Sequence, residues 1–142
     1  MGIERIFLND DAATAALGAR LAAELKPGSL VLLRGGLGAG KTALARAVVR
    51  TLVGDPGLDV PSPSFALVQP YETPGGSVLH ADLYRLGGPR EVDELGLFDR
   101  PEAIVLVEWP ERAGGELLSR DATLVTLSIP ADGQGRMAEI VR

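Results

Sequence analysis

The feature that most constrains this chain is the octapeptide GGLGAGKT at Gly35–Thr42, which fits the phosphate-binding pattern G-x-x-x-x-G-K-[ST]. The apolar run Leu30–Leu33 precedes it, and apolar residues at helical spacing follow it as far as Gly54, which is placed to end a helix. In such a strand–loop–helix unit, successive backbone N–H groups hold phosphates at the positive end of the helix dipole. The motif therefore predicts binding of a nucleoside triphosphate.

The alternative is a glycine-rich turn that matches by chance, because the chain contains 18 glycines. The flanking elements argue against chance, and so does lysine usage. Lys26 and Lys41 are the two lysines, and every other basic residue is arginine. A lysine kept inside the motif supplies the compact ammonium that phosphates bind. Lys41 is expected to reach the β- and γ-phosphates, and the Thr42 hydroxyl to ligate Mg²⁺.

Composition limits the other possibilities. The chain has 142 residues, 46% of them apolar and 23% charged, so we expect a single globular domain over residues 1–142. It has no cysteine and one histidine, which excludes disulfides and thiol chemistry and makes a zinc site improbable. The net charge of -5 lacks the basic field that dominates nucleic-acid binding. A partner is therefore expected to hold any nucleic acid that the chain serves.

Targeting signals are not apparent in the sequence. The start MGIERIF alternates charged and apolar residues and lacks the apolar core of a secretory signal. No apolar run approaches membrane-spanning length. We therefore expect a cytoplasmic protein without membrane contact.

The hydrophobic pattern predicts an α/β fold, a three-layer single domain with a mixed and partly antiparallel sheet. Helices are expected from Asp10 or Asp11 to about Leu25, after the phosphate loop, and over Pro89–Leu95. The residues around 70 and Ser77–Leu83 are expected to form a hairpin. Strands are predicted at Ile3–Leu8, Ser29–Arg34, the end of Val60–Tyr71, Ser77–Leu83, Ile104–Val107, Ala122–Ile129 and Met137–Val141.

Two carboxylates are candidates for metal and water chemistry. Glu108 follows four buried aliphatics, so it lies at the carboxyl end of a central strand, where ligands bind in open α/β sheets. Asp82 alternates with apolar neighbours on a strand, which makes it either a metal or water ligand or one half of an ion pair with an arginine. His80 is interpreted as a packing residue rather than a base.

The segment VPSPSF presents hydroxyl groups on a loop stiffened by two prolines. Nucleotide switches place a Ser or Thr that touches the metal and the γ-phosphate on a loop at this point of the chain. Ser64 is the candidate, with Ser62 beside it. The alternative, equally compatible with the local sequence, is a proline-rich turn whose serines cap backbone groups.

Together with GGLGAGKT, three further segments carry a family resemblance: SPSFALV at 62–68, HADLYRL at 80–86 and LVEWP at 106–110. In combination they resemble the TsaE (YjeE) family, small bacterial ATPases of the tRNA threonylcarbamoyladenosine (t⁶A) pathway, over nearly the full length. The family usually has Thr where this chain has Ser64, which keeps the hydroxyl and loses a methyl group.

The resemblance implies a P-loop ATPase that uses ATP and Mg²⁺ and acts on a TsaD-type transferase and its TsaB-type companion, meeting tRNA only through them. It implies roles for Asp11 and Thr14 around the adenine and for a late basic residue such as Arg136, and we expect Trp109 beside the nucleotide. Catalytic roles are expected for Glu108, Asp82 and Ser64, and metal binding for Thr42, Glu108 and Asp82. The implied ATP contacts in the loop are Gly36, Leu37, Gly38, Ala39, Gly40, Lys41 and Thr42.

Three other functions share features with this sequence. A small-molecule kinase shares the phosphate loop but needs an acceptor pocket and a lid, for which Gly87–Arg100 is the one candidate segment. A GTPase would recognise guanine through N-K-x-D, which is impossible because Asn9 is the only asparagine. A scaffold that binds nucleotide without hydrolysing it is disfavoured by Glu108.

Overall fold

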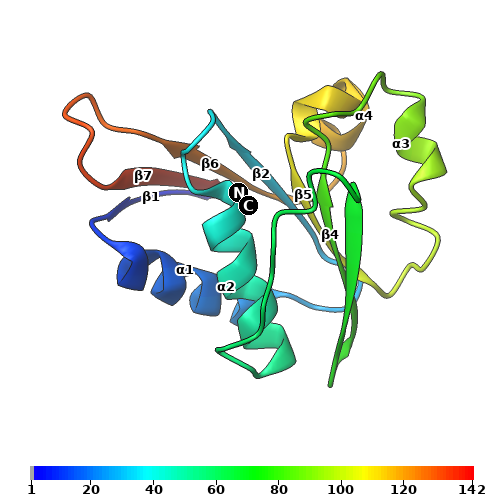
Figure 1. Ribbon diagram of the computed structural model, residues 1–142, viewed down its shortest axis with the longest axis horizontal. Coiled ribbons are helices and arrows are strands. Elements are labelled where there is room, and N and C mark those ends of the chain that lie inside the picture. Colours follow the sequence, from blue (N-terminus) through cyan, green and yellow to red (C-terminus); the bar gives the residue numbers. More distant parts are fainter. Residues whose placement is uncertain (1) are drawn as a thin grey trace.

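The computed structural model of the chain describes residues 2–142 and is organised around a seven-stranded sheet in the order β1-β7-β6-β2-β5-β4-β3 (Figure 1). The four central strands β6, β2, β5 and β4 run parallel, while β7 and β3 pair antiparallel with β6 and β4, and β1 pairs antiparallel with β7. The predicted mixed sheet and the hairpin are therefore confirmed. The strands are β1 Ile3–Leu8, β2 Leu30–Gly35, β3 Val68–Thr73, β4 Gly76–Asp82, β5 Ile104–Glu108, β6 Thr123–Ser128 and β7 Arg136–Val141.

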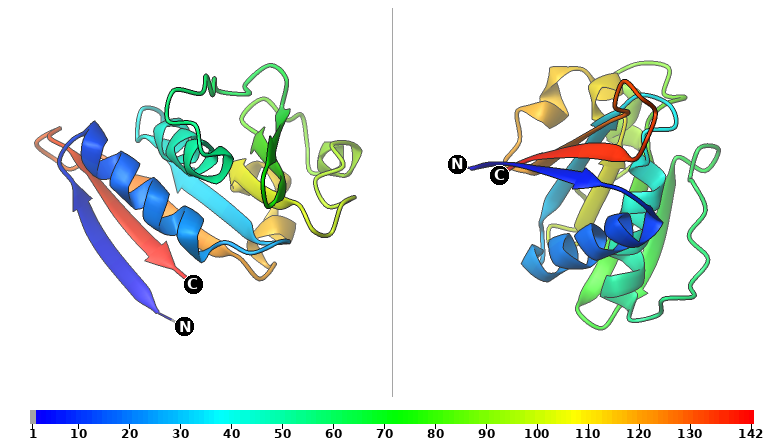
Figure 2. Two further views of the ribbon diagram at one scale, coloured as in Figure 1. Left: turned by 90° about the horizontal axis from the view of Figure 1, so that it is seen from below. Right: turned by 90° about the vertical axis from the view of Figure 1, so that its left-hand side faces the viewer.

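Helices cover both faces of this sheet, which confirms the three-layer prediction (Figure 2). The two long helices, α1 Asp11–Glu24 and α2 Lys41–Val53, lie side by side on one face. Three short elements cover the other face: α3 Glu91–Glu94, the 3₁₀ helix η1 Pro110–Ala113 and α4 Gly115–Leu118. Within residues 2–142, none of the helices combines the length and the apolar character needed to span a bilayer.

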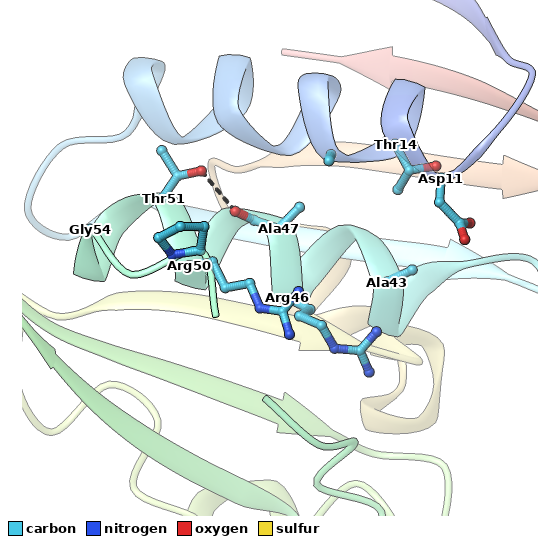
Figure 3. A pocket seen from close by; sticks show the side chains of 10 residues that line it. Asp11, Thr14, Ala43, Arg46, Ala47, Arg50, Thr51 and Gly54 are labelled. Carbon is cyan, nitrogen blue, oxygen red and sulfur yellow. Dashed lines mark hydrogen bonds between the residues drawn. The ribbon is translucent and has the colours of Figure 1, made fainter. Parts of the chain in front are cut away.

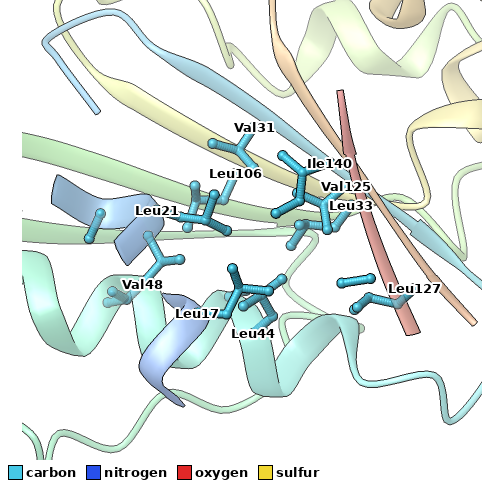
Figure 4. Close-up of a cluster of buried hydrophobic side chains, with 14 of the residues drawn as sticks. Leu17, Leu21, Val31, Leu33, Leu44, Val48, Leu106, Val125, Leu127 and Ile140 are labelled. Atoms are coloured by element: carbon cyan, nitrogen blue, oxygen red, sulfur yellow. The ribbon is translucent and has the colours of Figure 1, made fainter. Parts of the chain in front are cut away.

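The larger core lies between the sheet and the pair α1 and α2 (Figure 4). The two helices approach closely at Gly18, where an added Cβ would collide with the Cβ of Ala47. Glycine at this position therefore fixes the distance between α1 and α2, and with it the position of the loop that precedes α2. Side chains that fill this core include Leu17, Leu21, Val31, Leu33, Leu44, Val48, Leu106, Val125, Leu127 and Ile140.

The boundaries of the long elements follow their capping residues. The Asp10 side chain accepts a 2.8 Å hydrogen bond from the N–H of Ala13 at the start of α1, so of the two candidate caps, Asp10 and Asp11, the first is the one used. Gly54 ends α2 with φ of 84°, a left-handed conformation that glycine adopts without strain.

The second helical layer differs from the prediction in one set of bounds and in two added elements. The helix expected over Pro89–Leu95 is reduced to the single turn α3, and Arg90 before it offers no side-chain cap. Gly96, with φ of 67°, follows this turn closely, as the sequence predicts. The elements η1 and α4 were not expected at all.

Candidate nucleotide and metal site

The candidate site lies where the parallel strands β2, β5 and β4 end. Glu108 is the last residue of β5 and pairs in register with Leu33 of β2 on one side and Asp82 of β4 on the other. The prediction that Glu108 stands at the carboxyl end of a central strand is confirmed. The loop that follows β2 crosses this same edge and leads into α2, so one edge of the sheet gathers the glycine-rich loop and both carboxylates.

The glycine-rich loop has the open backbone that a phosphate needs. Gly38 and Gly40 have φ of 77° and 104°, and nothing lies within 4 Å of the place where a Cβ would stand at either residue. The N–H groups of Gly38, Gly40, Lys41 and Thr42 find no hydrogen-bond partner among residues 2–142. These free donors at the start of a 13-residue helix match what an anion requires.

Lys41 is folded back onto this loop. Its Nζ donates to the carbonyls of Gly35 at 2.7 Å and Gly36 at 2.8 Å and lies 4.1 Å from the centre of the Trp109 ring. Only 5% of Lys41 is exposed, and burial lowers the pKa of its ammonium, an effect that the charge of Glu108 opposes. A phosphate in the loop would give this buried ammonium a negatively charged partner in place of two neutral carbonyls.

Glu108 is held at both oxygens. The Thr42 hydroxyl donates to Oε1 at 2.8 Å, and Nε2 of His80 lies 2.6 Å from Oε2. The exposed fraction of Glu108 is 2%, and His80 is fully buried. His80 was interpreted from sequence as a packing residue. It is buried as such a residue would be, but it also contacts the candidate metal ligand.

Asp82 collects hydroxyl and backbone donors. Its Oδ2 accepts from Ser62 at 3.3 Å and from Ser64 at 3.4 Å, and its Oδ1 accepts from the N–H of Tyr84 at 2.9 Å. The two serine hydroxyls lie 2.7 Å apart. No arginine pairs with Asp82 among residues 2–142. Of the two alternatives for Asp82, the structure therefore does not contain the ion pair.

Aromatic side chains form the outer wall. Trp109 has an unusual φ of 58°, and its ring lies 4.8 Å from that of Tyr84. The guanidinium of Arg112 is 4.9 Å from the centre of the Tyr84 ring, a position near the site that sequence reasoning missed. The signal that was available is sequence proximity, since Arg112 comes three residues after Trp109.

Two cavities share Ala43, the third residue of α2, in their linings. The first, about 310 Å³, is lined by the loop, both serines, both carboxylates and the aromatic wall. The second, about 600 Å³, lies along α1 and α2, and Figure 3 shows Asp11, Thr14 and Ala43 at one end of it. Ala43 lines both cavities, so Asp11 and Thr14 adjoin the phosphate loop without being part of the first cavity.

Arg136, at the start of β7, reaches the loop itself. Its Nε donates to the carbonyl of Gly38 at 3.2 Å, although the two residues are 98 positions apart in sequence. The structure thus gathers the predicted residues at one sheet edge: Ser64, Asp82, Glu108, Trp109 and Arg136 around the loop, with Asp11 and Thr14 in the adjoining cavity.

The family model for the threonylcarbamoyl adenosine biosynthesis protein TsaE matches residues 8–138. The chain belongs to the TsaE family. Two relatives described as tRNA threonylcarbamoyladenosine biosynthesis protein TsaE support the match. The Aquifex aeolicus protein is 36% identical over 110 residues, which cover 78% of this chain and 79% of the relative. The Nostoc protein is 35% identical over 144 residues, which cover 96% of this chain and 84% of the relative.

Coverage is shorter against some TsaE relatives. The match to the Rickettsia felis protein, 40% identical over 107 residues, spans 75% of this chain and 62% of that protein. Among solved structures, Bacillus subtilis YdiB superposes with a TM-score of 0.75 at 25% identity, covering 98% of this chain and 84% of YdiB. The fold of this TsaE-family chain is thus shared with a solved structure over almost its whole length.

Proposed function

We propose that this chain is a Mg²⁺-dependent ATPase that acts in tRNA t⁶A modification on a complex of TsaD-type and TsaB-type proteins. The observation that carries the proposal is the 2.8 Å hydrogen bond from Thr42 to Glu108. It joins the start of the phosphate-loop helix to the end of strand β5, and phosphate-loop enzymes that cleave nucleotides hold their metal with such a hydroxyl and such a carboxylate.

The residues present fit a triphosphate. The free N–H groups of Gly38, Gly40, Lys41 and Thr42 would hold phosphate oxygens, and the open space at the loop glycines admits them without a clash. Lys41 would exchange its two carbonyl partners for phosphate oxygens.

The residues also fit Mg²⁺. The available donors are oxygens from Thr42, Glu108 and Asp82, the ligand type that this hard cation prefers. Residues 2–142 contain no group of three or more His, Cys, Asp or Glu side chains that could hold a metal ion. Mg²⁺ at phosphate sites is held by one or two carboxylates together with the phosphates, so such a group is not required. Bound Mg²⁺ would neutralise developing charge on the phosphates.

The adenine would enter the cavity between α1 and α2 at the end where Asp11 and Thr14 face Ala43 (Figure 3). This cavity adjoins the phosphate loop through Ala43. Arg136 would stabilise the loop through the Gly38 carbonyl and contribute positive charge beside the phosphates.

The loop that carries Ser62 and Ser64 would report on the γ-phosphate. The two hydroxyls bond to Asp82 at 3.3 and 3.4 Å, distances near the long limit for a hydrogen bond. A γ-phosphate or its metal would compete for both hydroxyls, so the loop would change its contacts with the nucleotide state.

We expect slow hydrolysis by the isolated chain. An arginine finger contributes roughly 10³- to 10⁵-fold in phosphate-loop enzymes. Three arginines close to residues of the site are engaged within the chain. Arg85 lies 4.2 Å from the Phe65 ring centre, and Arg112 lies 4.9 Å from that of Tyr84. Arg136 donates to the carbonyl of Gly38. Partner proteins would have to release one of them or supply their own.

The acidic character of the chain supports docking on protein rather than on tRNA. The net charge is -5 and the pI about 4.9, so the electrostatic term that dominates nucleic-acid affinity is missing. We propose that the chain meets tRNA only through its partners, in the cytoplasm.

A pull-down combined with a phosphate-release assay tests this function. The chain is mixed with the TsaD-type and TsaB-type pair, with MgATP and without nucleotide, and Lys41→Ala serves as the matched variant. We expect association that depends on ATP, faster phosphate release in the complex and neither effect in the variant. Failure to associate in both states, or transfer of the γ-phosphate to a small acceptor, would replace this proposal by a small-molecule kinase.

A further inference from the structure

His80 occupies an unusual position for a polar side chain. It lies on β4 with no exposed surface, on the sheet face that packs against the large core. Its Nε2 lies 2.6 Å from Oε2 of Glu108, and its Nδ1 is buried without a hydrogen-bond partner among residues 2–142. An apolar side chain at this position would avoid the unpaired nitrogen, so packing alone does not explain a histidine here.

The contact with Glu108 bears on which nitrogen of His80 carries the proton. A metal ligand must be ionised, and an ionised carboxylate only accepts hydrogen bonds, so in that state of Glu108 the donor is Nε2 of His80. Nδ1 is then the nitrogen with a lone pair, and a buried acceptor without a partner is tolerated better than a buried donor. The surroundings of the ring therefore favour the single tautomer that points its N–H at Glu108.

The two bonds to Glu108 leave its carboxylate no free rotation. Thr42 holds Oε1 from helix α2, and His80 holds Oε2 from strand β4. Thr42 is the second residue of α2, directly after the phosphate loop, whereas His80 lies within strand β4 and is fully buried. His80 is thus the contact that keeps the carboxylate in place when the loop changes its contacts around a nucleotide.

We propose that His80 is a positioning residue for the metal site: it orients the Glu108 carboxylate so that Oε1 faces Thr42 and Mg²⁺. The inference rests on the proposed nucleotide function and adds a residue to it. Groups that orient a metal ligand in this way typically change metal affinity by about 10- to 100-fold when they are removed. His80 itself touches neither nucleotide nor metal in this role.

Three substitutions separate orientation from packing. His80→Leu fills the volume and removes the donor, and His80→Asn keeps an amide that is too short to reach Glu108. His80→Gln places an amide N–H where Nε2 stood. The matched control is Val78→Ala, a fully buried change two residues earlier on the same face of β4. It disturbs packing without touching Glu108.

The measurement is ATP binding by calorimetry in the full chain, across a Mg²⁺ titration and again with the metal chelated. We expect His80→Leu and His80→Asn to raise the Mg²⁺ concentration that gives half of the metal-dependent gain in ATP affinity, by about 10- to 100-fold. The ATP affinity without metal should not change. In His80→Gln this Mg²⁺ concentration should lie within about threefold of the wild-type value, because glutamine keeps an N–H donor for Glu108. Val78→Ala should lower the melting temperature and leave the Mg²⁺ dependence unchanged.

Other results overturn the inference. An unchanged Mg²⁺ dependence in both donor-free variants, or equal losses with and without metal, would make His80 a packing residue. A glutamine variant that behaves like the leucine variant would do the same. Should His80→Leu fail to fold, the contrast between the asparagine and glutamine variants decides. If the wild-type chain binds no MgATP, the proposed function fails, and this inference fails with it. If the wild-type chain binds MgATP and the His80 variants show the same Mg²⁺ dependence, only the inference is rejected.

Discussion

Two carboxylate clusters of this molecule use similar hydrogen bonds in opposite surroundings. At the candidate site, Glu108 is 2% exposed and is held by Thr42 and His80. At the far edge of the sheet, Arg142 bonds to both oxygens of Glu24 at 2.7 and 2.9 Å and to Glu4 at 3.2 Å, with side chains 33 to 40% exposed. The first cluster is buried, whereas the second is open to water.

This difference in burial indicates that the exposed cluster around Arg142 serves stability, whereas the buried cluster around Glu108 serves ligand binding and chemistry. Exposed ion pairs are screened by water and contribute little, but they cost little to form. A buried carboxylate with a histidine and a threonine carries a large desolvation cost that an apolar cluster would avoid. Substitutions in the buried cluster should therefore affect ligand binding and turnover far more than those at the open edge, where only stability should respond.

The largest effect is expected for Lys41→Ala. The variant should weaken ATP binding by several kcal/mol, because it removes a charge-assisted contact of about 1.5–3 kcal/mol and leaves phosphate charge uncompensated. Calorimetric titration measures it, with Lys26→Ala as the control, since Lys26 is the other lysine and is exposed. Equal ATP affinities for wild type and Lys41→Ala would show that the glycine-rich loop does not bind the phosphates.

Glu108→Gln should separate binding from turnover. We expect ATP affinity measured with the metal chelated to stay close to wild type. Turnover should fall by roughly 100-fold, about 2.7 kcal/mol in the barrier, because the lost carboxylate acts mainly in the transition state. Phosphate release under saturating MgATP is the readout. Glu111→Gln, an exposed acid three residues later, should be normal. Near-normal turnover in Glu108→Gln would transfer the catalytic role to Asp82.

Ser64→Ala tests the loop before β3, whose serine hydroxyls donate to Asp82. Loss of one hydroxyl contact should lower turnover about fivefold, since a net hydrogen bond is worth about 1 kcal/mol. Ser62→Ala, which removes the neighbouring hydroxyl at the same carboxylate, shows which serine matters. If neither change affects turnover, the segment is the proline-rich turn that the sequence equally allowed.

The smallest effect belongs to the open cluster. Arg142→Ala should lower the melting temperature by no more than about 3 °C and leave ATP turnover unchanged. The hydrogen bond from Arg142 holds the pKa of Glu24 below its ordinary value of 4.5, so this stabilisation is present above pH 4.5 and is lost as the pH falls further.

The melting curves should therefore differ at pH 7 and converge as the pH falls below 4.5. A difference that persists unchanged into acid would show that Arg142 acts through packing of its side-chain stem.

Much of the fold could be predicted from local patterns. Strand β1 has the predicted bounds, Asp10 is one of the two caps that the sequence allows, and Gly54 ends α2 as predicted. The elements η1 and α4 could not be predicted, because each is a single turn and helical periodicity needs several. Their position instead follows from packing of Ala113 and Leu117 on the sheet.

The site was less predictable, because its contacts cross between elements. Alternation put His80 and Asp82 on one strand face, but only the parallel register of β4 with β5 brings His80 to Glu108. From the sequence, Asp82 could be either a metal or water ligand or one half of an ion pair with an arginine, and the local pattern does not distinguish these two roles. Partners distant in sequence decided that question, since Ser62 and Ser64 come from the loop before β3.

The most direct test of the central claim is calorimetric titration of ATP into the purified wild-type chain, with Mg²⁺ and with the metal chelated. A triphosphate in the loop and a metal between Thr42 and Glu108 predict one saturable site per chain that binds ATP more tightly with Mg²⁺ than without it. The absence of saturable binding in both conditions, or an affinity for GTP equal to that for ATP, would contradict an ATP site at this edge of the sheet.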